Sequence, residues 1–364
     1  MNFLEGNLVI KNNIKSGKII FNEVIENITF EKSTKDYNLI IPGFIDLHCH
    51  GGGGHDTMEG LDAIKGLSKF HLYNGTTSIF PTTVTSNLDK TFAALKGLNK
   101  YLNNNQNSTN IEGIHLEGPF INPNKLGAQP PLTQKPNFNF IDVLKKEAPI
   151  KIMTLAPEID GGLQLIDTLI KNDIKPQIGH TLANFDLCNL AINKGVNSFT
   201  HLYNAMSGLD HRKPGAVAAA FTSLKYSEII CDLVHVNTDM IKLAFKNVKK
   251  LYAITDCISA AGMKDGIYNL GTNKVIKKGN IIKLNDNTFG GSVLTMLGAF
   301  KNLLSIGFSI AEAVKLTSTN AANYLNRNDL GNLDLGSSAN FLVLDNNFNI
   351  LKVFLNGKNI YETE

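Results

Sequence analysis

The stretch from Lys175 to Pro214, KPQIGHTLANFDLCNLAINKGVNSFTHLYNAMSGLDHRKP, decides which fold the chain is expected to adopt. Two short apolar runs in it end at His180 and His201, and the residues from Leu187 to Gly195 have the spacing and the terminal glycine of a helix. This pattern predicts two parallel strands joined by a helix, with one imidazole at the carboxyl end of each strand. In parallel α/β folds these ends bind ligands. A single such histidine is more often a structural core residue, but the matched pair favours a shared site.

Composition limits the class of protein. The chain has 364 residues, 43% hydrophobic and 18% charged, which predicts a globular protein with a large core. The net charge of +3 is small and basic runs do not exceed a pair, so we expect no nucleic-acid partner. We expect no signal peptide and no membrane partner, because a basic-then-apolar leader and a span-length apolar run are both missing. The 4 cysteines follow no disulfide pattern, which predicts a cytoplasmic location.

Strands and helices are predicted to alternate through the middle of the chain. Most of the predicted strands end on His, Glu or Asp; they are Phe44–His50, Thr77–Thr85, Ile111–Glu117, Ile150–Pro157, Pro176–His180, Asn197–His201, Ile229–His235 and Tyr252–Asp256. Such a series predicts an α/β fold, a (β/α)8 TIM-type barrel with its chemistry at the strand ends. A doubly wound sheet is the main alternative, but neither G-x-G-x-x-G after an early strand nor a P-loop is present.

The two ends of the chain have a different pattern from the middle. Residues 1–42 and 330–364 contain short apolar runs separated by Gly and Asn, so we expect them to pair into one small β-sandwich domain, with residues 43–329 forming the barrel. Within the barrel, Asn269–Phe289 is predicted to be a polar β-hairpin and a helix is expected from Val293. A further helix should begin at the capping box Ser309-x-x-Glu312.

The first predicted strand ends in His48-Cys49-His50. Because side chains alternate along a strand, the two histidines should face one way and Cys49 the other. Two imidazoles at this spacing can bind one metal ion, although an H-x-H pair alone is only a moderate signal. The glycines Gly51–Gly54 that follow would let the backbone approach a ligand, or form a flexible loop.

Two carboxylates are also placed at predicted strand ends. Glu117 could bind a metal, bridge two metals or act as a base, with a salt bridge at the rim as the structural alternative. His115 shares its face but lies deeper, and we expect it to be structural. Asp256 could take a proton from water and deliver it to a leaving group. Together with the histidines, these residues predict a hydrolytic metal centre drawn from five strands.

These residues belong to motifs that resemble the amidohydrolase superfamily and, within it, the family of N-acetylglucosamine-6-phosphate deacetylases. The motifs run through nearly the whole chain: PGFIDLH at Pro42–His48, HLEGPF at His115–Phe120, GHT at Gly179–Thr181, THLYNAM at Thr200–Met206, TD at Thr255–Asp256 and L-x-x-G-x-x-A at Leu333–Ala339. HLEGP and HLYNAM are the specific ones, whereas H-x-H and the strand-end Asp are shared with many relatives.

The resemblance implies a hydrolase of amino-sugar metabolism that removes acetate from N-acetyl-D-glucosamine 6-phosphate and leaves D-glucosamine 6-phosphate. It implies that Glu117, His180 and His201 bind the catalytic metal and that Asp256 is the general base and acid. The implied substrate contacts are Ala128, Gln129, Asn204, Ala205, Arg212, His235, Phe289, Gly290 and Gly291. Arg212 offers a bidentate fork for a phosphate, with a solvated loop cation as the alternative. His235 could instead be a core histidine.

Two departures from the family pattern affect what the resemblance implies, and a third has no catalytic meaning. Some members have His where this chain has Gln129, so polarisation of the substrate carbonyl would depend more on the metal. Some lack the H-x-H pair and use one metal, whereas His48 and His50 here allow a second ion bridged by Glu117. Asn320–Ala322 replaces a common Asn-Pro-Ala, which we interpret as a local change in a helix.

Several alternatives stay open at this point. Histidine and carboxylate ligands suit zinc, iron, manganese or cobalt, as one or two divalent ions per chain. The resemblance suggests a homodimer with the phosphate site near the subunit interface. Another amidohydrolase, dihydroorotase-like or aminoacylase-like, is a second hypothesis, but those relatives commonly use a strand-end lysine where this chain has Glu117. A non-catalytic barrel scaffold is a third, although such proteins typically lose the ligands that this chain keeps.

Overall fold

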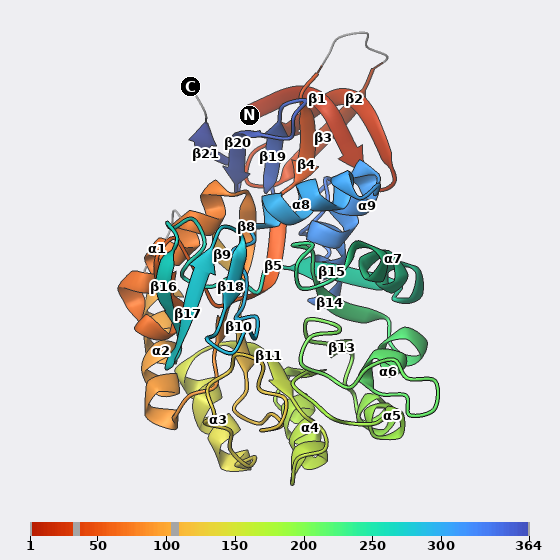
Figure 1. Cartoon of the computed structure of the whole chain (residues 1–364). Helices are drawn as coiled ribbons and strands as arrows, with labels where there is room; N and C mark the ends of the chain where they lie inside the picture. Colours follow the sequence, from red (N-terminus) through yellow and green to blue (C-terminus); the bar gives the residue numbers. More distant parts are fainter. Residues whose placement is uncertain (1, 32–36, 103–108, 363–364) are drawn as a thin grey trace.

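Strands from both ends of the chain lie together in one sheet at one end of the molecule (Figure 1). The computed structural model describes residues 2–31, 37–102 and 109–362. The sheet has the order β21-β20-β19-β4-β1-β2-β3. Its strands are β1 (Asn2–Ile10), β2 (Asn13–Phe21), β3 (Ile25–Phe30), β4 (Leu39–Pro42), β19 (Phe341–Leu344), β20 (Ile350–Leu355) and β21 (Lys358–Glu362). Parts of the domain predicted from 1–42 and 330–364, namely 1, 32–36 and 363–364, lie outside the described residues. The division into two domains stays a prediction.

Aromatic packing holds this terminal sheet together. The Phe341 ring lies edge-on to Phe21, with centroids 4.9 Å apart, and stacks on Phe354 at 4.7 Å. These rings come from β19, β2 and β20, so they join strands from opposite ends of the chain. Phe341 is 0% exposed, and burial of such a ring is among the larger single contributions to a core.

A curled parallel sheet forms the centre of the molecule, in the order β13-β12-β11-β10-β8-β5 with the short β9 paired to β8. These strands are β5 (Phe44–Cys49), β8 (Thr76–Thr83), β9 (Asn110–Ile111), β10 (Ile114–Glu117), β11 (Ile150–Leu155), β12 (Lys175–Ile178) and β13 (Ser198–Phe199), and β14 (Tyr226–Ile230) and β15 (Lys250–Ile254) form a parallel pair. The Leu202 N–H donates to Glu228 O at 2.9 Å and the Asp256 N–H to His48 O at 3.0 Å, which connects this pair to both edges of the sheet. The predicted α/β class with a parallel sheet is therefore confirmed.

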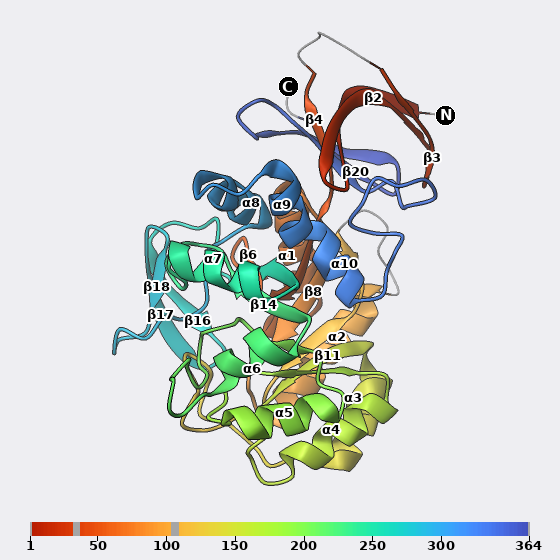
Figure 2. The ribbon, with the colours of Figure 1, turned by 90° about the vertical axis from the view of Figure 1, so that its right-hand side faces the viewer.

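Helices surround the parallel strands (Figures 1 and 2). They are η1 (Thr57–Glu59), α1 (Leu61–Tyr73), α2 (Leu88–Leu102), α3 (Phe138–Glu147), α4 (Gly162–Lys171), α5 (Phe185–Asn193), α6 (Ala216–Ser223), α7 (Thr238–Asn247), α8 (Met296–Ser305), α9 (Ile310–Val314), the π-helical η2 (Lys315–Thr319) and α10 (Asn320–Tyr324). Helix α4 is amphipathic, because Leu165, Ile166 and Leu169 are buried and the polar Gln164, Asp167 and Lys171 are exposed. No helix within the described ranges is long and apolar enough to cross a bilayer.

Side-chain caps determine where α5, α8 and α9 begin. The Asn184 side chain accepts from the Leu187 N–H at 2.9 Å and starts α5, which ends before Gly195 as predicted. The predicted capping box of Ser309 and Glu312 is present at the start of α9. Helix α8 begins at Met296, later than the Val293 predicted, because the Thr295 side chain caps it.

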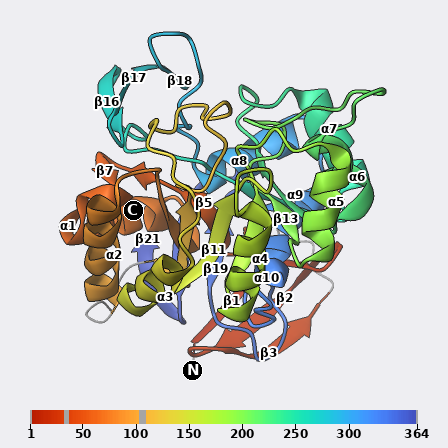
Figure 3. The same cartoon turned by 90° about the horizontal axis from the view of Figure 1, so that it is seen from below.

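Two predicted β-segments are divided in the structure. Ile111–Glu117 forms the separate strands β9 and β10, interrupted at Gly113. In place of the hairpin predicted for Asn269–Phe289, a three-stranded antiparallel sheet starts earlier, with β16 (Gly266–Leu270), β17 (Asn273–Lys278) and β18 (Ile281–Lys283). Gly271 and Gly279, with φ of 57° and 56°, make the two turns that this arrangement needs. Figure 3 shows this small sheet and β1–β3 on opposite sides of the molecule. A short pair, β6 (Gly51–Gly52) and β7 (His55–Asp56), follows β5.

The predicted strands that carry polar ends are shorter than expected. Strand β12 ends at Ile178, before His180, and β13 ends at Phe199, before His201. Strand β14 ends at Ile230, so His235 lies in the loop beyond it and not at a strand end. His180 and His201 therefore lie just after their strands, where the backbone can turn.

We predict that Phe341→Ala lowers the free energy of unfolding by about 3–5 kcal/mol, because it leaves a cavity between strands from both chain ends. Urea unfolding, followed by circular dichroism, measures the change. Leu335→Ala is the control, since that side chain is 64% exposed and its loss should change stability by less than about 0.5 kcal/mol. Equal effects of the two substitutions would contradict the proposed contribution of the aromatic cluster.

Candidate metal centre

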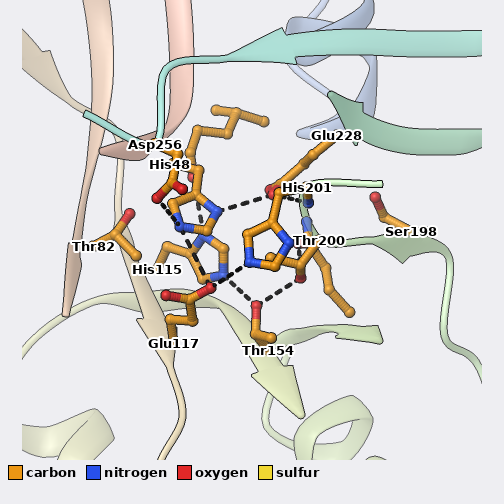
Figure 4. A network of polar contacts seen from close by, with 12 residues as sticks. His48, Thr82, His115, Glu117, Thr154, Ser198, Thr200, His201, Glu228 and Asp256 are labelled. Atoms are coloured by element: carbon orange, nitrogen blue, oxygen red, sulfur yellow. Dashed lines mark hydrogen bonds and ion pairs between the residues drawn. The ribbon is translucent and has the colours of Figure 1, made fainter. Parts of the chain in front are cut away.

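Glu117 lies at the centre of a group of imidazoles that come from different strands (Figure 4). Its Oε1 is 3.0 Å from His201 Nε2 and 3.2 Å from His180 Nε2. Its Oε2 is 3.2 Å from His50 Nε2, and His48 Nε2 is 3.6 Å from Oε1. All five side chains are buried. Thus the structure brings together the five residues that the sequence predicts as metal ligands.

The H-x-H pair has the geometry that strand alternation predicts. His48 and His50 face the same side, with their Nε2 atoms 3.2 Å apart. Cys49 faces away, and its sulfur lies 3.0 Å from His71 Nε2 and 3.2 Å from the carbonyl oxygen of Gly51. The thiol is therefore part of the packing behind the centre and does not point into it.

Asp256 completes the centre from the eighth parallel strand. It follows β15, and its Oδ1 lies 3.2 Å from His50 Nε2 and 3.4 Å from His48 Nε2. Its side chain is 13% exposed, more than that of any of the five histidine and glutamate side chains. Asp256 is thus the group that a substrate in the adjoining cavity would meet beside the ligands.

Strained backbone aims three of these side chains. His180, His201 and Asp256 have φ of 47°, 29° and 49°, in the left-handed region that non-glycine residues rarely adopt. Each such residue costs of order 1–3 kcal/mol, so the surrounding structure must hold it in place. For His180 this support includes its Nδ1 atom, 2.8 Å from the carbonyl oxygen of Lys125, which turns Nε2 toward Glu117.

The charges in the centre shift each other's pKa values. Burial opposes the charged form of Glu117, but His48 and His180 outweigh it and hold the pKa of this carboxyl well below its usual range. Burial opposes the charged form of His50 too, yet hydrogen bonds with Asp256 and Glu117 raise its pKa to about 10. The same group of histidines lowers the pKa of Asp256 to about 2 against the effect of burial. His115 differs, because burial and the charge of His48 lower its pKa to about 4.

The donor set fits a divalent cation. Glu117, His180 and His201 present one ligand atom each within 4.8 Å of one another, and so do His48, His50 and Glu117. Imidazole nitrogens only 3.1–3.2 Å apart repel one another when protonated, and a bound cation removes that repulsion by taking their lone pairs. Two such groups that share Glu117 can hold one ion or two.

A third cluster of possible donors lies behind β5 and fits a metal less well. Asp46, Cys49 and His71 are also within 4.8 Å of one another. However, the Asp46 carboxylate already accepts from the Thr255 hydroxyl at 2.6 Å, and His71 Nε2 lies 2.9 Å from the Gly51 carbonyl oxygen. These contacts support the loop after His50 without an ion.

The centre opens into a cavity of about 220 Å³. Seven of the predicted substrate contacts line it, and they are Ala128, Gln129, Asn204, Ala205, His235, Phe289 and Gly291. Gly290 is not among the lining residues; a side chain there would approach Val275 at 3.0 Å. The cavity therefore brings most of the predicted substrate contacts next to the centre.

Arg212, like Gly290, is a predicted substrate contact that does not line this cavity. It is exposed in the loop before α6, and its main-chain N–H donates to the Asp210 carboxylate at 2.7 Å. Its predicted contact with a substrate phosphate therefore stays a prediction. The position of a loop residue such as Arg212 depends on tertiary packing. The local sequence HRKP does not reveal it.

Two predicted contacts are held by neighbours that the sequence did not indicate. Gln129 donates from Nε2 to Glu117 and accepts from the Thr85 N–H at 2.7 Å, so its amide supports the centre directly. His235 Nδ1 lies 2.6 Å from Asp232 Oδ2. Burial opposes the charged form of His235, but this carboxylate raises its pKa.

Sequence reasoning missed Glu228, Leu270 and Thr288. Leu270 and Thr288 line the cavity from the small sheet β16–β18 and the loop after it. Glu228 lies on β14, fully buried, with Oε2 3.0 Å from His48 Nδ1. The sequence did offer one signal for Glu228. It is a charged residue directly before the apolar run Ile229–Ile230, with which the predicted strand begins.

The amino-acid sequence is similar to those of known proteins along most of its length. Residues 39–360 match the amidohydrolase family. The chain is 33% identical to N-acetylglucosamine-6-phosphate deacetylase of Bacillus subtilis, over 94% of this chain and 92% of that protein. It is 32% identical to N-acetylgalactosamine-6-phosphate deacetylase of Escherichia coli O157:H7, over 92% and 91%.

The fold is also similar to solved structures of such deacetylases. The crystal structure of N-acetylglucosamine-6-phosphate deacetylase from Thermotoga maritima superimposes with a TM-score of 0.92 at 31% identity, over 100% of both chains. That of a mutant of the Mycobacterium smegmatis enzyme, in complex with N-acetyl-D-glucosamine 6-phosphate, has a TM-score of 0.91 at 27% identity over 98% of both chains.

We predict that His180→Asn, His201→Asn and Glu117→Gln each lower the affinity for a divalent ion by at least about 10-fold, since each removes one converging ligand. Elemental analysis after dialysis against a weak chelator measures the bound metal. His211→Asn is the matched control, because that side chain is exposed in a loop. Full metal content in all three variants would rule out these residues as ligands.

We also predict that metal uptake near pH 7 releases protons. His50, with a pKa of about 10 in the metal-free chain, carries a proton at pH 7 and must lose it to bind an ion. The affinity should therefore rise with pH, by about tenfold per pH unit for each displaced proton. Calorimetric zinc titrations in two buffers with different ionisation enthalpies count the protons. No proton release would contradict the prediction.

Proposed function

The chain belongs to the amidohydrolase family, and on that basis we propose that it hydrolyses N-acetyl-D-glucosamine 6-phosphate to D-glucosamine 6-phosphate and acetate. The observation that carries the proposal is the convergence of Glu117, four histidines and Asp256 at the mouth of one cavity, in a chain that matches such deacetylases along nearly its whole length. This reaction needs a group that activates water, one that accepts its proton and one that binds the sugar.

Each part of the centre has a role in this reaction. Glu117, His180 and His201 would hold a divalent ion, and His48 with His50 a second one that shares Glu117. When bound, the metal supplies Lewis-acid chemistry that polarises the amide carbonyl and makes water more acidic. Zinc, iron, manganese and cobalt all suit these ligands.

Asp256 would move the protons. Its low pKa means that the carboxylate is ionised at neutral pH, as a general base requires. It would accept the proton of the attacking water, and then donate it to the amine nitrogen as the C–N bond breaks. Gln129, held between Glu117 and the Thr85 N–H, would keep the carboxylate of Glu117 in its position.

The sugar phosphate would lie in the adjoining cavity. Asn204, the Ala205 N–H and His235 offer polar contacts at its walls, and His235 is a candidate cation for the phosphate because Asp232 favours its protonated form. Gly290 would contribute through the backbone next to Phe289 and Gly291. Arg212 could reach a phosphate by movement of its exposed loop or from a second copy, which is consistent with the predicted homodimer.

N-acetyl-D-galactosamine 6-phosphate is the second candidate substrate. A relative that is 32% identical carries that name, against 33% for the relative that is named for the glucosamine compound. The two sugars differ only in the orientation of one hydroxyl, so the metal centre serves either. The cavity walls would decide between them.

The finer structural expectations belong with this proposal. We infer that the six main strands of the seven-stranded parallel sheet, without the short β9, act with the β14–β15 pair as one (β/α)8 barrel, because hydrogen bonds join both edges. The terminal sheet would be the predicted small β-sandwich. The free thiols of Cys49, Cys188, Cys231 and Cys257 support a reducing compartment such as the cytoplasm.

We expect acetate release from the 6-phosphate at least about 10-fold more efficiently than from unphosphorylated N-acetylglucosamine, since a phosphate makes charge-assisted contacts. The test is kcat/KM for N-acetylglucosamine, its 6-phosphate and the galactosamine 6-phosphate. Faster turnover of the galactosamine compound would favour the second candidate. No acetate from any of them would exclude the proposed reaction. Arg212→Ala, assayed on the first two sugars, shows whether this loop cation selects the phosphate.

Asp256→Asn should lower turnover by about 10²–10⁴-fold, because the amide keeps the shape but cannot accept a proton. Metal content and substrate affinity should stay close to normal, since Glu117, the histidines and the rest of the cavity wall are unchanged and the amide keeps the shape of Asp256. All three quantities are measured on one preparation. Activity that is lost only in proportion to lost metal would make Asp256 a ligand and not the base.

A further inference from the structure

A buried carboxylate lies next to the candidate metal centre and is not among the residues that line the cavity. Glu228 on β14 is 0% exposed, and its Oε2 lies 3.0 Å from His48 Nδ1 and 3.2 Å from the His201 main-chain N–H (Figure 4). The hydroxyl of Tyr252 is 3.5 Å from the other oxygen. One carboxylate oxygen thus contacts a residue of each predicted ligand group.

Such a carboxylate is costly to bury. Removing a charge from water is unfavourable by several kcal/mol unless hydrogen bonds and an opposite charge compensate it, and an apolar residue of similar size often stabilises a fold better. Glu228 nevertheless lies in the core, where the His48 ring and the His201 main-chain N–H are its compensating partners. Its retention in the core therefore suggests a role beyond packing.

The contacts of Glu228 determine how His48 presents its ring. When Nδ1 carries the proton and donates it to Glu228, the lone pair of the imidazole is on Nε2. That atom lies 3.2 Å from His50 Nε2 and faces Glu117. The same oxygen holds the backbone of His201, whose Nδ1 atom has no hydrogen-bond partner among the described residues. Without Glu228, His48 could rotate or bind through the wrong nitrogen.

We propose that Glu228 is a positioning residue of the metal centre, which fixes the ring of His48 and the main chain of His201 so that both Nε2 atoms face Glu117. This inference rests on the metal centre of the proposed function but not on the identity of its substrate. In this role Glu228 fixes the tautomer and the ring orientation of His48 and the main-chain position of His201. Carboxylates that hold metal-binding histidines in this way typically contribute about 10- to 100-fold in metal affinity.

The polar network around Glu228 provides a matched control. The Tyr252 hydroxyl lies 3.0 Å from Gln177 Nε2 and 3.1 Å from the Ser198 hydroxyl, in the same buried layer. These hydrogen bonds, and the longer one to Glu228, leave His48 and His201 untouched. Tyr252→Phe therefore perturbs the network without removing a contact of a ligand.

The experiment measures zinc binding to the purified, metal-free, full-length chain by calorimetric titration. The thermal unfolding of the same metal-free protein is also measured. Glu228→Gln keeps the size and removes the charge, and we expect it to weaken zinc binding by about 10- to 100-fold. Tyr252→Phe should change it by less than about 3-fold, because it alters no contact of a metal-binding histidine. In a His48→Asn background, Glu228→Gln should cause a smaller loss than in the wild-type chain, because one of its two contacts is already absent.

Unchanged zinc affinity and stoichiometry in Glu228→Gln would overturn the proposal, and so would a lower melting temperature of the metal-free protein with normal zinc binding. If Glu228→Gln does not fold, Glu228→Asp, which withdraws the carboxylate by one methylene, gives the same decision. The titration contains no sugar, so its result is independent of whether the deacetylation assay succeeds.

Discussion

A negative charge surrounded by imidazoles, out of contact with water, is the constraint on which the rest of this structure depends. Glu117 has no exposed surface to speak of, at 1%, and four imidazoles lie within 3.6 Å of its oxygens. A carboxylate in such a place is tolerated only if its partners are held in position, since losing one leaves an uncompensated buried charge. Its partners follow three other parallel strands, so the sheet has to curl until these strand ends meet.

The packed strands provide the rigid part of the fold, and the side chains of the centre lie at or just beyond the strand ends. His48 and Glu117 lie on the last residues of β5 and β10, whereas β12, β13 and β15 end before His180, His201 and Asp256, which adopt left-handed backbone that turns their side chains inward. That conformation is unfavourable in isolation and persists because packed strands and helices on both sides hold the chain. The terminal sheet lies at the opposite end of the parallel strands, where it adds core without approaching the centre (Figure 1).

Electrostatics and metal binding are coupled through the same atoms. In the metal-free chain His48 and His50 compensate Glu117 and Asp256 by holding protons, since the pKa of His48 is well above its usual value and that of His50 is about 10. A cation would take over this compensation, so binding exchanges protons for metal. The Lys125 carbonyl contacts Nδ1 of His180, and Glu228 contacts Nδ1 of His48. These contacts decide that Nε2 of each ring is the nitrogen available to a metal ion.

The sequence by itself determined the features that depend on local spacing. Alternation along a strand put His48 and His50 on one face, and the strand–helix–strand pattern placed His180 beside His201, because both follow from backbone geometry over a few residues. The tertiary structure alone decided contacts between distant segments. It joined Glu228 to His48 across 180 positions and Gln129 to Glu117, and it left Arg212 in an exposed loop. These outcomes depend on where each strand stops and on the left-handed turn that follows, which a periodic pattern does not encode, because packing across the whole sheet selects them.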